Sequence, residues 1–156
     1  MYFYNPEYDY FTETTLEKCD IFADLFVLSV ERGLASISFV TELMTNPVYK
    51  FWVTTDESQE WCDEYFLLQV FENIKPFKKG GVANSFDMWF MGYTYKYWMR
   101  TRKMSPKRIF KILPVEWFLT RMGKYHTEDY DYVIDDAIKY RKIDKYAMEL
   151  ACKGID

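Results

Sequence analysis

The stretch FDMWFMGYTYKYWM, residues 86–99, constrains the fold of this chain more than any other. Its side chains are apolar or aromatic on nearly every side of a helix, whereas a surface helix has one apolar stripe and one polar face. Such a helix must be buried around most of its circumference, or must find a partner on its second side. We therefore predict that a helix capped by Ser85 and ending near Lys103 lies at the centre of the protein.

The rest of the chain also shows helical periodicity, and no credible alternating strand is present. Proline or a capping residue marks several helix starts: Ser105 with Pro106, Pro47, Pro114, Thr127, and Asp56 with Gln59 in capping-box spacing. The remaining predicted helices are 15–31, 36–44 and 145–153. The sequence thus predicts an all-α, compact domain of about seven to eight helices.

The two halves of the chain contain similar predicted segments in the same order. Each has a long aromatic helix, a short helix, a "PV" followed by aromatic residues, and an acidic start to an amphipathic helix. Residues 75–84, KPFKKGGVAN, hold a proline, two glycines and three lysines, which is typical of a linker. We predict two pseudo-repeated helical modules. The predicted boundaries are an aromatic N-terminal arm (1–13), module one (14–74), the linker (75–84) and module two (85–156).

Composition narrows the class of protein. Aromatic residues make up 21% of the 156 positions, and a surface rich in tyrosine is common at binding faces, although biased composition is an equal alternative. The net charge of −4 argues against a dedicated nucleic-acid binder. We find no apolar run of about 20 residues and no secretion signal. The three cysteines are widely spaced, which favours free thiols in the cytoplasm and neither a metal site nor a cofactor.

A basic cluster with interleaved aromatic residues is the first candidate site. Arginine and lysine crowd the end of the central helix and the start of the next. The candidate partner-binding residues are Arg100, Arg102, Lys103, Lys107, Arg108, Lys111, Tyr97 and Trp98. They could follow a phosphate backbone and stack bases, dock an acidic protein surface, or form a solvated face. The acidic chain favours a solvated face or protein docking over nucleic acid, and binding to nucleic acid would weaken steeply with salt.

The stretch TRMGKYHTED, residues 120–129, holds the second candidate site. Arg121 precedes His126, the single histidine, by five positions. RNases of the higher-eukaryote-prokaryote nucleotide-binding type use such a pair across a homodimer, the arginine to stabilise phosphate charge and the histidine to act on the 2′-hydroxyl. The alternative, which we favour, is that His126 and Thr127 only begin a helix, where an imidazole bonds to the backbone.

The second half, roughly 90–140, resembles a family of short helical bacterial proteins of unknown function. The matching residues are Met104, Ser105, Ile109, Phe110, Leu113, Tyr125, His126, Thr127, Val133, Ile134 and Asp135. Members are often encoded beside ADP-ribosyltransferase-like toxins. The resemblance implies a cytoplasmic, non-enzymatic protein that binds a toxin or defence enzyme, as an antitoxin or as an accessory or inhibitor protein of a toxin–antitoxin or phage-defence system. The metal-independent RNase and the nucleic-acid binder stay open as alternatives.

Overall fold

The computed structural model describes residues 13–55 and 62–142, and within them it confirms an all-α protein. The helices are α1 (Glu13–Glu31), α2 (Ser36–Thr45), the 3-10 turn η1 (Pro47–Tyr49), α3 (Lys50–Thr54), α4 (Glu64–Ile74), α5 (Ser85–Arg102), α6 (Pro106–Ile112), α7 (Val115–Thr120), α8 (Met122–Tyr125) and α9 (Tyr130–Lys142). Among these residues the one bridge between extended segments joins Leu34 to Lys79.

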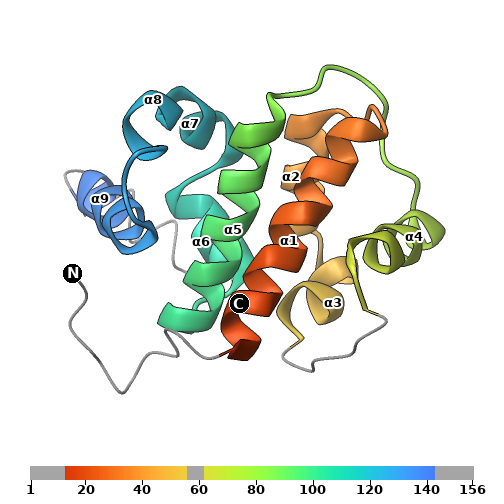
Figure 1. The fold of residues 1–156 in the computed structure, drawn as a ribbon, viewed down its shortest axis with the longest axis horizontal. Helices are drawn as coiled ribbons and strands as arrows, with labels where there is room; N and C mark the ends of the chain where they lie inside the picture. Colours follow the sequence, from red (N-terminus) through yellow and green to blue (C-terminus); the bar gives the residue numbers. More distant parts are fainter. Residues whose placement is uncertain (1–12, 56–61, 143–156) are drawn as a thin grey trace.

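Helix α5 is the centre of the fold, as its sequence predicts. Every residue from Phe90 to Thr101 is buried. Figure 1 shows α5 lying alongside α1, with α6 to α9 on one side of this pair and α3 and α4 on the other. Helix α5 is therefore covered by α1 on one side and by α6 and α9 on the other. This explains why it has no polar face.

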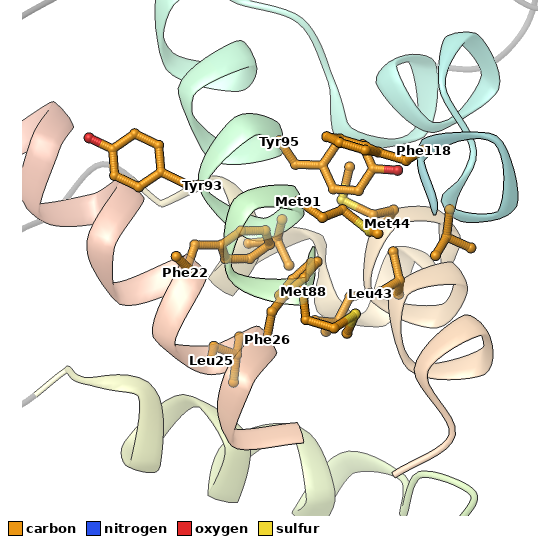
Figure 2. Close-up of a cluster of buried hydrophobic side chains, with 14 of the residues drawn as sticks. Phe22, Leu25, Phe26, Leu43, Met44, Met88, Met91, Tyr93, Tyr95 and Phe118 are labelled. Atoms are coloured by element: carbon orange, nitrogen blue, oxygen red, sulfur yellow. The ribbon is translucent and has the colours of Figure 1, made fainter. Parts of the chain in front are cut away.

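The contact between α1 and α5 is unusually close at Gly92. A Cβ atom there would lie 2.9 Å from the carbonyl oxygen of Phe22 and 3.0 Å from Cα of Ala23. Figure 2 shows Phe22 and Phe26 of α1 directed into the core that α5 lines with methionine and tyrosine. The hydrogen in place of a side chain lets the two helix backbones approach each other.

The predicted linker lies against the first module. Its peptide groups bond to the turn between α1 and α2, through Ala35 N–H to the Lys78 carbonyl (2.9 Å) and Gly80 N–H to the Gly33 carbonyl (3.1 Å). Phe77 is buried, and its ring packs against Tyr49 with a centroid distance of 5.6 Å. The segment therefore contains no helix but holds a fixed path over the α1–α2 turn (Figure 1).

Contacts between helices recur in the two halves. Helix α4 packs on α1 as α9 packs on α5, and α7 contacts α2 as α3 contacts α6. Buried side chains of both halves belong to one hydrophobic cluster. A duplicated module would produce such equivalent contacts, and the duplication stays a prediction from the sequence.

Two predicted helix starts are wrong by one or two residues. The side chain of Asn84, not Ser85, caps α5, accepting from Phe86 N–H at 2.8 Å. Asp129, not Thr127, accepts from the first turn of α9. Helix α4 begins at Glu64 with Asp63 as its cap, and the predicted start at Asp56 and Gln59 lies outside the described residues. At α5 and α9 a better-placed amide or carboxylate oxygen reaches the free N–H groups.

Two other predicted helix starts are confirmed, and several predicted segments lie outside the described residues. Ser105 caps α6, and its Oγ accepts from Arg108 N–H at 3.3 Å. Pro47 occupies the first turn of η1. Most of the N-terminal arm (1–12), the stretch 56–61 and the predicted helix 145–153 lie outside the described residues.

Candidate interaction surface

The structure divides the basic–aromatic cluster into a buried part and an exposed part. Tyr97 and Trp98 are buried, with exposed fractions of 1% and 0%, so neither ring has a surface on which a base or partner could stack. Arg100 is 8% exposed, and its Nε donates to Thr15 Oγ1 at 3.1 Å. These three residues hold α5 in the core rather than facing outward.

Arg102 connects α5 to α9. Its guanidinium donates to Asp135 at 2.9 Å and to Asp131 at 3.1 Å, and Tyr97 Oη donates to the second oxygen of Asp131 at 2.9 Å. Burial lowers the pKa of Arg102, but the bonds and charges of the two aspartates outweigh it, so the net pKa is raised. Arg102 is therefore a charged structural link between helices.

The lysines of the basic–aromatic cluster, in contrast to these arginines and aromatic residues, reach the surface. Lys103 is exposed and follows α5 in the left-handed conformation, with φ of 52°. Lys107 is half-buried and Lys111 exposed, and they stand four positions apart on α6. Residues four apart lie on the same side of a helix. We call Lys103, Lys107 and Lys111 the basic face. Arg108 is half-buried beside it.

Arg121 packs among aromatic rings. Its guanidinium carbon lies 3.9 Å from the ring centroid of Tyr140 and 5.2 Å from that of Trp117. Its charge also acts on two neighbours: it opposes the rise that burial causes in the pKa of Tyr125, and it contributes to the lowered pKa of Asp136. Stacking of this kind is a common structural use of arginine.

His126 takes a different set of partners. Its side chain is exposed, its Nδ1 lies 2.6 Å from the carbonyl oxygen of Met122, and its ring meets Phe86 edge-on at 6.4 Å between centroids. Neither Tyr125 nor Trp117 is among these partners of the imidazole. Arg121 thus faces α7 and α9, whereas His126 faces the start of α5.

Tyr125 anchors the turn between them. It is fully buried and its Oη donates to Asp136 at 2.7 Å. Burial, then the bond to Asp136, raises the pKa of Tyr125. Burial tends to raise the pKa of Asp136, but bonds from Tyr125 and Lys124 give a net lowering. Tyr125 therefore stays protonated and holds α8 to α9.

An acidic groove between α1 and α4 was missed by the sequence analysis. It has a volume of about 240 Å³, and its lining residues are Asp24, Val27, Leu28, Glu31, Glu64 and Tyr65. One wall of the groove can be recognised in the sequence, because Asp20, Asp24 and Glu31 recur at helical spacing on one side of α1. That α4 would form the opposite wall depends on long-range packing, which spacing does not reveal.

Burial and neighbouring carboxylates raise the pKa of two carboxyl groups in this region, Asp20 and Glu64. Burial and then the charge of Asp24 raise the pKa of Asp20. Burial, Asp24 and Asp63 together raise the pKa of Glu64, despite a bond to its own backbone that lowers it. At neutral pH these groups are ionised at some cost in stability.

The described cysteines are buried free thiols, as predicted. Burial raises the pKa of Cys19 to about 12, against the opposing charges of Lys96 and Arg100, and burial likewise raises that of Cys62. A thiol of this kind is a poor nucleophile at neutral pH. Cys152 lies outside the described residues.

Neither a metal cluster nor a membrane span occurs in residues 13–55 and 62–142. No three His, Cys, Asp or Glu side chains there are grouped to hold an ion. No helix in the same ranges is long and apolar enough to cross a bilayer.

Comparisons with protein-family models, curated proteins and solved structures find no match to this chain. The family resemblance of the second half therefore depends on its residue pattern alone and stays a hypothesis.

Proposed function

We propose that the chain is a non-enzymatic interaction module that binds a protein partner, as an antitoxin or as an accessory or inhibitor protein of a toxin–antitoxin or phage-defence system. The observation that supports this most is the separation of exposed charge. The basic face lies at the end of α5 and on α6, whereas the exposed Asp24 and Glu31 lie on the second half of α1 and the half-buried Glu64 begins α4. Segregated charge of this kind steers and orients a protein partner.

Binding to nucleic acid receives less support from the same residues. The rings of Tyr97 and Trp98, on which bases would stack, lie in the core. Arg100 and Arg102 are bonded to side chains of α1 and α9. The remaining lysines are few, and the net charge of −4 opposes a polyanion.

A pull-down from the native host tests the proposal. We expect the tagged wild-type chain to retain a specific protein. We expect the variant Lys103→Glu/Lys107→Glu/Lys111→Glu to retain at least about tenfold less of it, because reversed charge repels a partner that matched the basic face.

The matched control reverses three exposed lysines elsewhere, Lys50→Glu/Lys75→Glu/Lys78→Glu, with the same change in net charge. It should retain the partner at the wild-type level. Equal loss in both variants, or no specific protein with the wild type, would contradict the proposal.

The family resemblance supports one further expectation about the partner. If the retained protein is an ADP-ribosyltransferase-like toxin, co-expression of this chain should restore growth to cells that the toxin arrests. A partner of another enzyme class would leave the interaction module intact and reject the toxin assignment.

The second candidate function is a metal-independent RNase that uses Arg121 and His126. One observation favours it: the imidazole of His126 is exposed and thus accessible to a substrate. RNA cleavage in the presence of EDTA should then fall by about a hundredfold or more in His126→Ala. Equal activity of wild type and variant on bulk RNA would exclude this function.

A further inference from the structure

The groove between α1 and α4 has an apolar floor and acidic rims. Leu28 is buried at its base and Val27 is half-buried beside it. Tyr65 forms part of the α4 wall, and 57% of its surface is exposed to solvent. At about 240 Å³ the groove has room for part of a partner's side chains, although not for a large ligand.

The carboxylates come from both walls. Asp24 and Glu31 stand seven positions, about two turns, apart on α1, and Glu64 begins α4 opposite them. In the part of the chain that the structure describes, none of the three forms an ion pair. The repulsion between Asp24 and Glu64 is therefore not relieved by lysine or arginine of the described residues.

These features together select one kind of occupant. Lysine and arginine have long apolar stems that can lie along Val27, Leu28 and the ring of Tyr65, while their charged heads reach the carboxylates. A nucleic acid would be repelled, and the described acidic residues are not grouped to hold a metal ion. An apolar peptide would leave the carboxylates without partners.

The geometry points to a docking groove, between α1 and α4, for a lysine- or arginine-rich amphipathic segment of the partner protein. This inference rests on the proposed protein-binding function and identifies the partner's chemistry at a second surface, apart from the basic face. The occupant pairs with Glu64, whose charge is opposed by burial and by Asp24 in the free protein, so binding relieves a cost already present in the fold.

The test uses the full chain and a fluorescein-labelled synthetic amphipathic peptide of lysine and leucine, measured by fluorescence anisotropy. We expect wild type to bind it with an affinity that falls with salt. The groove variant Asp24→Asn/Glu64→Gln should bind about tenfold more weakly, since two charge contacts are removed. A glutamate–leucine peptide should not bind.

The control variant Glu116→Gln/Glu128→Gln removes two exposed carboxylates of other helices and turns, with the same change in net charge. It should bind the lysine–leucine peptide within about twofold of wild type. Equal weakening in both variants would show attraction to net charge alone and would overturn the groove. Unchanged binding in the groove variant would overturn it as well.

Amide chemical-shift mapping with the same peptide locates the contact. Shifts confined to α1 and α4 support the groove, and shifts confined to other helices reject it. Neither outcome depends on the pull-down. If the wild-type chain retained no specific protein there, that result would contradict the proposed function and not the groove. The two proposals therefore fail by different measurements.

Discussion

Gly92 is the position where the fold is most sensitive to a single added carbon. In Gly92→Ala the new Cβ would lie 2.9 Å from the Phe22 carbonyl oxygen, 2.9 Å from Cγ of Phe26 and 3.0 Å from Cα of Ala23. Two of these neighbours are backbone atoms of α1, which cannot rotate away. The substitution must push α1 and α5 apart along their shared contact.

Two opposing effects set the magnitude. Alanine is favoured over glycine within a helix by about 1 kcal/mol. Overpacking in a core costs about 1–3 kcal/mol, and we expect the upper end here because backbone resists movement. The net loss is therefore about 2 kcal/mol, which for a chain of this size lowers the melting temperature by about 4–8 °C.

The assay is thermal unfolding followed by circular dichroism, with urea unfolding as a second measure. Gly123→Ala is the matched control, because a Cβ at this helical glycine would meet nothing within 4 Å. The control should melt at or above the wild-type temperature. A Gly92→Ala protein as stable as Gly123→Ala would refute the close packing of α1 on α5.

Three further predictions concern charge and thiols. Arg102→Ala should lower the free energy of unfolding by about 2 kcal/mol, measured in urea, because a partly buried aspartate loses its partner; a loss below about 0.5 kcal/mol would match a surface ion pair instead. The pKa of Glu64 is raised in the folded protein, partly by the charge of Asp24, so ionised Glu64 opposes folding at neutral pH. This cost disappears as pH falls through the raised pKa toward the ordinary value of 4.5. Asp24→Asn should therefore be more stable than wild type at pH 7 but not at about pH 3. If Asp24→Asn gained more stability over wild type at low pH than at pH 7, the expected pH dependence would be contradicted. Iodoacetamide should leave Cys19 and Cys62 unmodified in the native protein and alkylate both in urea, as peptide mass spectrometry can show. Rapid native labelling would disprove their burial.

The central helix could be predicted because its sequence offers no alternative. A segment without a polar face has to be surrounded, and α5 is. The start of α6 was equally predictable, since Ser105 and Pro106 provide a cap and a first-turn proline in adjacent positions. Local chemistry sufficed in both cases.

Helix caps were less predictable where several capping residues stand close together. Asn84 and Ser85 are adjacent, and either side chain can accept from a helix N-terminus. Which one does so depends on the path of the linker across the α1–α2 turn. That path is set by contacts distant in sequence, which propensities do not contain.

The interaction surface was the hardest part to predict. Sequence places Arg100 beside Lys103, yet one is buried against α1 and the other is exposed at the end of α5. The buried arginine is tolerated because Thr15 accepts a hydrogen bond from it across 85 positions of the chain. Such a pairing, like the joining of α1 and α4 into one groove, appears only in three dimensions.

Hydrogen–deuterium exchange of the chain, alone and bound to the protein that it retains from its host, shows which surfaces meet the partner. We expect partner binding to slow exchange in α6 and the end of α5, and also along α1 and the start of α4. We expect no change in α7 and α8. Protection confined to the segment around Arg121 and His126 would contradict docking at the basic face and the groove, and would place recognition at the other candidate site.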